Sequence, residues 1–302
     1  MIHTTDRPLF KTCRKQYEYK VVKRLSPKAR KNEIEIGNAG HEALAIYYKN
    51  NLFTQPVFSF EDIVSDLDYE VDKDDLTLLL DSYHLKYYET DKDIKVLHVE
   101  EQFKYVPDKN KEDEGISSTG DLVFIKNGQT CLRDHKFYKK LKDNMLMGID
   151  DQLSTYIANL NWNGIKIQFA ELNQICTNVP VIPEKGVRGK LLKSGITTTP
   201  ELIDMACRIH NLNPDDYADW KLSCANEVFL RHVTFRSRKQ IEEHLEQMTY
   251  DIAEMKNPRY YRNTGYHCRY CDYFQICNTE YEGGSPIEII DEGFYIRPDG
   301  IR

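Results

Sequence analysis

The chain has no long hydrophobic run. None of its apolar stretches approaches the roughly 20 residues that a helix needs to cross a bilayer, and the N-terminal MIHTTDRPLFKTC lacks the apolar core of a secretory signal peptide. Internal repeats and low-complexity tracts are also missing. We therefore expect a cytoplasmic protein, in which cysteines stay free or bind metal instead of forming disulfides.

The chain also lacks the overall positive charge that nucleic-acid-binding proteins often carry, since its net charge is −7. Its basic residues are nevertheless concentrated in three runs. Residues 11–31 hold nine Lys or Arg against Glu18, residues 133–142 hold five against Asp134, and residues 185–193 hold four and no acid. A single run of this kind is most often a solvated face, but three together predict a site for a polyanion.

The order of the predicted elements indicates a mixed α/β or α+β fold. Apolar spacing predicts helices at 8–24, 32–48, 61–92, 150–161 and 237–255, and alternation predicts strands at 95–106, 116–137, 165–177 and 226–235. Residues 183–222 are punctuated by Gly and Thr and read as an insertion with its own short helix. The last twenty residues are expected to form a tail or a capping hairpin. This order predicts a central mixed sheet flanked by helices.

Four cysteines have the spacing of a metal or cluster site. Cys268, Cys271 and Cys277 read Cys-x2-Cys-x5-Cys, and Cys13 stands alone near the N-terminus. The first two of the trio are too close in sequence for a useful disulfide. Four thiolates suit zinc or an iron–sulfur cluster, and spacing alone does not separate the two. Such a site would clasp the two ends of the chain together. The other cysteines are expected to be plain buried thiols: Cys131, Cys176, Cys207 and Cys224.

A predicted hairpin places two acidic residues face to face. Asn127-Gly128 between alternating apolar residues is a strong hairpin signal. With these two as the turn, Asp121 lies opposite Asp134, and like charges in that position are destabilising. A divalent cation would relieve the repulsion, and Lys136 would point to the same face, where an ammonium could act on a water or a phosphate. The alternative is an exposed hairpin whose repulsion is screened by solvent.

Two further features are weak when taken alone. His41 lies in an apolar-rich helix behind Gly37 and Gly40, where a lone His is more often a core or surface residue than a ligand. Gln152 and Tyr156 are four residues apart and share one helix face. Both are more informative in combination with the hairpin, because His41 precedes it in the sequence and the Gln–Tyr pair follows it.

Together these residues resemble the PD-(D/E)XK nuclease superfamily. A helical His, an Asp, Asp-x-Lys on adjoining strands and Gln-x-x-x-Tyr on the next helix resemble its RecB-type branch. One Cys before the core and three after it resemble the iron–sulfur members of that branch, the AddB-type recombination nucleases and the CRISPR-adaptation exonucleases. The basic, Gly-rich insertion also looks like phage-encoded nucleases of this group. The resemblance runs from Cys13 to Cys277.

The resemblance implies a role for each motif residue. Lys136 would be the catalytic lysine, and Gln152 and Tyr156 would contact DNA or support the metal site. Many members have a further Glu on the preceding strand, which could be Glu100 or Glu101. Asp134 stands where many members have Glu, a shortening that should keep metal binding intact. The ligands of one or two Mg²⁺ or Mn²⁺ ions would be His41, Asp121, Asp134 and the backbone carbonyl of His135.

The implied function is metal-dependent exonucleolytic cleavage of DNA, on single strands or ends, in recombination, repair or phage DNA processing. The implied organisation is one nuclease domain over residues 1–281, closed by a 4Fe–4S clasp, with residues 282–302 as a tail. Zinc remains the alternative for the clasp. Two other functions stay open: a structure-specific endonuclease, and a catalytically silent nucleic-acid-binding module. The sequence does not identify a partner, whether helicase, annealing protein or integrase.

Overall fold

A mixed sheet of six strands forms the centre of the computed structural model, which describes residues 1–28, 32–108, 110, 114–143 and 147–298. The strand order is β1-β4-β5-β6-β7, and β3 pairs with β4 beside this path. β1 with β4 and β5 with β6 are parallel, and the other pairs are antiparallel. The strands are β1 (Ile2–His3), β3 (Lys95–Tyr105), β4 (Ile116–Lys126), β5 (Gln129–Tyr138), β6 (Phe169–Cys176) and β7 (Phe229–Thr234).

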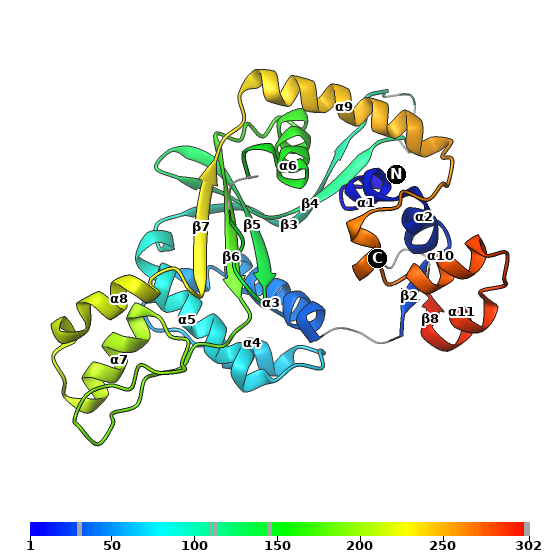
Figure 1. The fold of residues 1–302 in the computed structure, drawn as a ribbon. Coiled ribbons are helices and arrows are strands. Elements are labelled where there is room, and N and C mark those ends of the chain that lie inside the picture. The colour runs from blue at the N-terminus through cyan, green and yellow to red at the C-terminus, as the bar shows by residue number, and fades with distance from the viewer. Residues whose placement is uncertain (29–31, 109, 111–113, 144–146, 299–302) are drawn as a thin grey trace.

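Helices cover both faces of the sheet, which confirms the predicted fold class (Figure 1). Successive residues of a strand point to opposite faces. Leu122 packs into a core with α3 (Asn32–Lys49), α4 (Glu61–Asp66) and α5 (Lys73–Asp91). Val123 packs into a second core with α6 (Asp151–Trp162) and α9 (Arg238–Lys256). Among the described residues, no helix is both long enough and apolar enough to span a membrane.

The β4–β5 hairpin has the predicted register. Asn127 and Gly128 have φ values of 51° and 77°, as a two-residue hairpin turn of this type requires. Pairing runs from Lys126↔Gln129 to Leu122↔Arg133 and, among the described residues, ends there. Beyond that point β5 continues against β6, whereas β4 continues against β3 and, at its start, against β1. The sheet therefore forks immediately before Asp134.

The N-terminal segment is helical but interrupted. α1 (Asp6–Thr12) and α2 (Arg14–Tyr17) are separated by Cys13, whose φ of −157° and ψ of 112° are extended. A π-helical turn follows at Glu18–Val22. The continuous helix predicted for 8–24 is therefore wrong at Cys13, where the backbone changes direction at a predicted cluster ligand.

The C-terminal residues pack against this N-terminal segment. α10 (Phe274–Tyr281) and α11 (Ile287–Gly293) lead into β8 (Phe294–Ile296), which pairs antiparallel with β2 (Leu25–Pro27). Tyr19 and Tyr273 stack across the two segments, with ring centroids 5.8 Å apart. Residues 287–296 thus form a helix and a strand paired with the other end of the chain (Figure 1), and residues 299–302 lie outside the described part.

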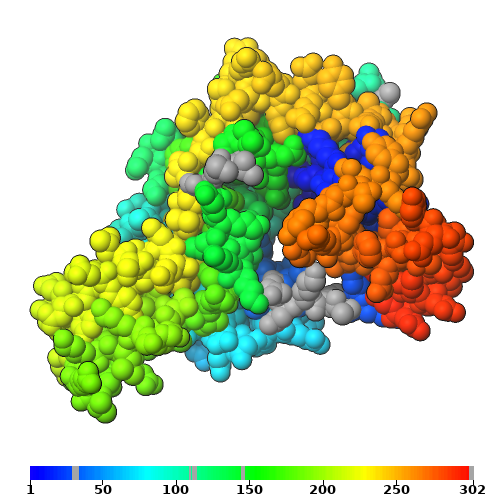
Figure 2. All heavy atoms as spheres, viewed as in Figure 1, coloured from blue at the N-terminus to red at the C-terminus, as the bar shows by residue number. Residues whose placement is uncertain are grey.

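The predicted insertion between β6 and β7 forms a small unit with its own apolar cluster (Figure 2). It contains α7 (Pro200–His210) and α8 (Ala218–Cys224). Lys86 of α5 anchors it, donating to the Ala225 carbonyl at 3.0 Å. Its cluster consists of Leu191, Ile203, Ala206, Cys207, Tyr217 and Cys224.

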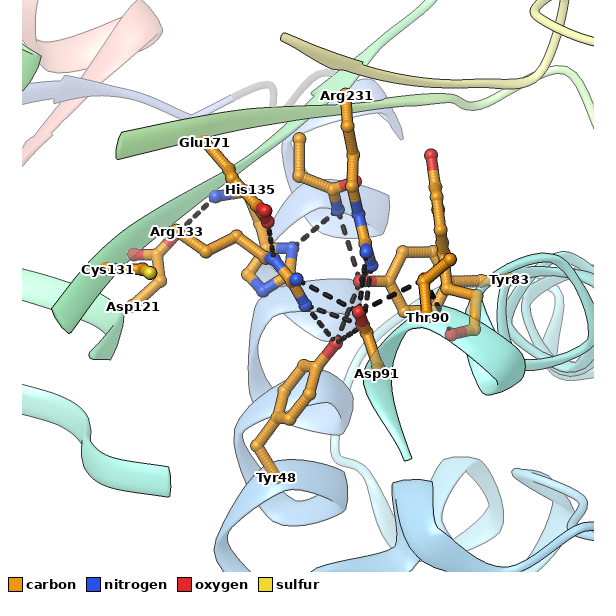
Figure 3. Close-up of polar contacts among 12 residues, drawn as sticks. Tyr48, Tyr83, Thr90, Asp91, Asp121, Cys131, Arg133, His135, Glu171 and Arg231 are labelled. Carbon is orange, nitrogen blue, oxygen red and sulfur yellow. Dashed lines mark hydrogen bonds and ion pairs between the residues drawn. The ribbon is translucent and has the colours of Figure 1, made fainter. Parts of the chain in front are cut away.

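A buried ionic cluster joins α5 to β5, β6 and β7 (Figure 3). Arg133 is fully buried and contacts Asp91 and Glu171, each at 2.7 Å. Arg231 reaches the other oxygen of Asp91, also at 2.7 Å. Because Arg133 lies in this cluster, counting it in a surface basic run was wrong. Strand alternation separates it from Asp134 and Lys136, which lie on the opposite face of β5.

Removing the central anion of this cluster is expected to destabilise the fold. Asp91→Asn leaves two buried guanidinium groups short of negative charge, and we expect a loss of about 3–5 kcal/mol in the free energy of unfolding. Urea titration followed by circular dichroism measures it. Glu89→Gln on the same helix is the control, because its exposed pair with Lys92 is worth less than about 1 kcal/mol. Equal losses in the two variants would contradict this account.

Candidate active site

A cavity of about 510 Å³ opens beside the fork of the sheet. It lies between α3, strands β3 to β5 and α6. Its lining includes His41, Lys49, Glu100, Asp121, Lys136 and Tyr156.

The fork explains why Asp121 is held in place. His135 is two residues beyond the last β4–β5 pair, so the β4 backbone does not pair with its amide. The N–H instead donates to Oδ2 of Asp121 at 2.6 Å. The carboxylate thus bridges the diverging strands, which satisfies an amide that would be costly to leave unpaired. Asp134 lies beside Asp121 on β5 and is only 3% exposed.

A third carboxylate comes from β3. The pairs Val99↔Leu122 and Glu101↔Gly120 place Glu100 opposite Asp121. Glu100 has a φ of 49°, a left-handed conformation that costs a non-glycine residue free energy and that clusters at functional sites. Glu101 is bonded to His98 instead. Of the two glutamates considered from the sequence, Glu100 is the one in the cavity.

His41 completes a possible metal-binding group. One ligand atom each from His41, Glu100 and Asp121 lie within 4.8 Å of one another. Gly40 allows α3 to approach β5 this closely, because a Cβ at Gly40 would lie 2.2 Å from the Phe137 ring. Burial, together with the positive charge of Lys136, lowers the pKa of His41 to about 4. The imidazole is therefore neutral at neutral pH, the form that binds metal.

The carboxylates and Lys136 are coupled by charge. Lys136 Nζ lies 3.0 Å from Asp134. Burial alone would lower the pKa of Lys136, but Asp134 and Asp121 raise it overall, so the side chain is an ammonium. Burial raises the pKa of Asp121 and of Asp134 to about 6. Desolvation and the neighbouring Asp121 raise the pKa of Glu100 to about 7. Lys136 thus lies among three carboxylates, and the positive charge of Lys49 acts on Glu100 as well.

α6 brings the Gln–Tyr pair to the cavity wall. Asp150 caps the helix, accepting from the Leu153 N–H at 2.7 Å. Gln152 Nε2 donates to the Tyr156 hydroxyl at 2.6 Å. Tyr156 lines the cavity and Gln152 orients its hydroxyl from one turn away. Arg7, fully buried, fixes this helix to α1 through a 2.6 Å bond to Thr155.

The ionic cluster reaches the site through His135 (Figure 3). Arg231 donates to Oδ1 of Asn173 at 3.1 Å, and Nδ2 of Asn173 lies 2.8 Å from Nδ1 of His135. The His135 ring packs with Tyr48 and lies 6.4 Å from the His41 ring, while its backbone N–H holds Asp121. The predicted use of its carbonyl as a metal ligand stays a prediction.

The four clasp cysteines belong to segments that pack together. Burial raises the pKa of Cys271, and so does the nearness of Cys13 and Cys268. The Asn263 side chain donates to the Thr12 carbonyl at 2.8 Å, next to Cys13. Cys277 packs with Cys271 against the Tyr19–Tyr273 cluster. Within the described part of the chain, which includes all four cysteines, no three of their sulfurs form a group within 4.8 Å.

Sequence reasoning missed Lys49 in the cavity lining. It follows His41 by two helical turns, with Ala45 between, and all three line the cavity. Spacing of four residues from a suspected ligand was the available signal. The predicted N-terminal basic run is also less free than it looked, because Lys15 pairs with Glu18 and Lys11 with Asp151. Arg30 and Lys31 of that run lie outside the described residues.

The donor set fits a small divalent cation. Carboxylate oxygens suit Mg²⁺ or Mn²⁺, and an imidazole nitrogen shifts the preference toward Mn²⁺. Burial is the main reason that the pKa values of Glu100, Asp121 and Asp134 are raised. A bound cation would stabilise the charged carboxylates that burial disfavours.

Cation binding should strengthen as pH rises. Protons compete for carboxylates whose pKa values are about 6 to 7, so Mn²⁺ affinity should increase roughly a hundredfold between about pH 5.5 and about pH 7.5. Isothermal titration calorimetry, with the Mn²⁺-induced rise in melting temperature as a second readout, measures this. Asp121→Asn should lose the binding at both pH values. Equal affinity at the two pH values in the wild type would contradict the carboxylate site.

Comparison with known proteins agrees with this geometry. The family described as the PD-(D/E)XK nuclease superfamily matches residues 8–278. No curated protein matches the chain. The matched range contains all four clasp cysteines and every residue of the cavity lining except His3. The chain belongs to the PD-(D/E)XK nuclease superfamily.

Proposed function

We propose that the protein is a metal-dependent DNA exonuclease that hydrolyses phosphodiester bonds at DNA ends or on single strands. The observation that carries this proposal is the fork of the sheet. There Glu100 and Asp121 line one cavity with Lys136, and the buried Asp134 lies 3.0 Å from Lys136 Nζ just behind the cavity wall. Superfamily membership supports nuclease activity, and the RecB-like His41 and Gln152–Tyr156 pair supports the exonuclease mode.

His41, Glu100, Asp121 and Asp134 would hold Mg²⁺ or Mn²⁺. The cation would supply charge stabilisation for the phosphate and a lower pKa for water. The neutral imidazole offers its nitrogen without a proton to displace. The bridge from the His135 N–H keeps Asp121 aimed into the cavity. The protein would thus hold its ligand oxygens in place before the substrate arrives, which reduces the reorganisation needed for the reaction.

Lys136 would act on the reacting groups directly. Its ammonium has three donors, of which Asp134 takes at least one, and the others can reach a phosphate oxygen or the attacking water. Tyr156, whose pKa is raised mainly by burial, stays protonated and can donate to the phosphate chain. Gln152 would keep that hydroxyl in position.

Removing the ammonium should abolish cleavage without abolishing metal binding. Lys136→Ala is expected to reduce the rate about a hundredfold to a thousandfold, by analogy with loss of a single electrostatic donor, while Mn²⁺ affinity stays within a few-fold. Lys140→Ala, an exposed lysine of the same strand end, should cleave like the wild type. Digestion of labelled DNA at the wild-type rate by Lys136→Ala, or by Asp134→Ala, would refute the site assignment.

The mode of cleavage is read from end-labelled single- and double-stranded DNA with Mn²⁺ or Mg²⁺. Products that shorten progressively from one end support the exonuclease and give its polarity. Cuts at internal junctions in circular or end-blocked DNA would instead support a structure-specific endonuclease. Binding without any cleavage would support the silent module.

We also propose that Cys13, Cys268, Cys271 and Cys277 hold a 4Fe–4S cluster. Four thiolates suit either zinc or a cluster. One cysteine before the nuclease core and three after it resemble the iron–sulfur members of the superfamily, and this resemblance favours the cluster over zinc. Its role would be structural, joining α1 and α2 to the segment around α10.

Loss of one clasp cysteine should reduce both the visible absorbance and the thermal stability of the protein. Cys13→Ala is expected to remove the broad visible absorbance of the purified protein and to lower its melting temperature. Cys207→Ala, in the separate cluster of the insertion, should keep the absorbance. A colourless wild type with stoichiometric zinc would overturn the cluster. A folded Cys13→Ala variant with full activity would overturn the structural role.

A further inference from the structure

The segment between α9 and α10, together with α10 itself, exposes an unusual number of aromatic rings. Large fractions of the side chains are in solvent at Tyr260, Tyr261, Tyr266, Tyr270, Phe274 and Tyr281. Residues 257–271 also contain three arginines and no acidic residue, in a chain whose net charge is −7. Figure 2 shows this segment (orange) projecting beside a hollow that separates it from the sheet. Exposed aromatic patches mark interaction sites.

Two tyrosines form the centre of this surface. Tyr266 and Tyr270 are 68% and 70% exposed, and their ring centroids lie 5.6 Å apart. Their hydroxyls share a hydrogen bond of 3.0 Å. The Arg269 guanidinium lies 5.2 Å from the Tyr266 ring. We define these three residues as the tyrosine platform.

The platform lies in a turn that backbone hydrogen bonds hold. It occupies the 3-10 turn Tyr266–Tyr270, in which Cys268 lies between the two tyrosines and Cys271 follows directly. The Cys271 N–H bonds the Cys268 carbonyl at 3.4 Å, and the Cys268 N–H bonds the Gly265 carbonyl at 3.0 Å. Two exposed rings on a turn fixed in this way are arranged before a ligand arrives, which lowers the entropy cost of binding.

We propose that the tyrosine platform binds unpaired bases of single-stranded DNA; this rests on the proposed nuclease function only for the choice of DNA as the polymer. Aromatic rings stack on any base, and arginine adds both cation–π contact and charge for the phosphates. The absence of acid from residues 257–271 matches a polyanion. The platform would thus bind the strand at a second place, outside the cavity that contains the carboxylates.

The binding test separates stacking from charge. Fluorescence anisotropy, without added Mg²⁺ or Mn²⁺, measures the affinity of the purified full-length protein for a labelled single strand. The Tyr266→Ala/Tyr270→Ala double variant should bind about tenfold more weakly or worse, and Tyr266→Phe/Tyr270→Phe should bind like the wild type because the rings remain. Tyr250→Ala, which removes a comparably exposed tyrosine from α9, is the matched control and should also bind like the wild type.

A base-free strand completes the test. All of these proteins should bind an abasic deoxyribose-phosphate strand with similar, weak affinity. Unchanged affinity of the alanine double variant for the normal strand would overturn the proposal and leave a protein as the partner of this surface. An equal loss on the abasic strand would also overturn it, because the effect would then not come from stacking. Melting temperature and visible absorbance show whether the variants keep the fold and the clasp.

These outcomes are independent of the catalytic proposal. If the wild type cleaves DNA but the alanine double variant binds normally, the platform fails and the nuclease stands. If the wild type cleaves nothing but its strand binding depends on the two rings, the platform stands and the nuclease fails.

Discussion

The contact of Arg133 with Asp91 and Glu171 holds the part of the sheet on which the site depends. Arg133 is the last residue of β5 that pairs with β4, and Asp134 is the first beyond the fork. A buried guanidinium with two anions fixes β5 on one side of the sheet, while the Asp121–His135 bond fixes it on the other. Burying these charges costs desolvation energy that the ion pairs only partly return. The ion pairs of Arg133 instead serve to position the next three residues of β5, which are Asp134, His135 and Lys136.

The cavity is electrostatically incomplete in the protein alone. Glu42, Glu100 and Asp121 line it with Lys49 and Lys136, and Asp134 lies against Lys136, so carboxylates outnumber ammonium groups. Burial raises the pKa values of Asp121 and Asp134 to about 6. A folded protein rarely leaves such an excess of buried carboxylates in place without a use for it. The left-handed backbone of Glu100 is a second unfavourable feature in the same place. Both costs fall on the residues that would bind the cation, which ties the strain to function.

Much of the site could be predicted because its signals are local. The Asn127-Gly128 turn fixes the hairpin register, and the register places Asp121 near Asp134 without knowledge of the rest of the fold. The choice of Glu100 over Glu101 could not be made, since it depends on how β3 pairs with β4 around Leu97, where the register shifts. Arg133 was misread as a surface charge because its partner Asp91 is distant in sequence. The break at Cys13 was missed because helical spacing continues through it.

The pairing of β2 with β8 sets an order on the assembly of the protein during synthesis. Residues 13–27 leave the ribosome long before residues 268–296, with a delay of roughly 10–50 s at ordinary elongation rates. During that interval Tyr19 and Leu25, both nearly fully buried in the finished fold, have no partner surface. The sheet and its cavity can form first, whereas the N-terminal segment must wait. Cys13, which is buried in the finished fold, is likewise left uncovered and open to oxidation during that interval.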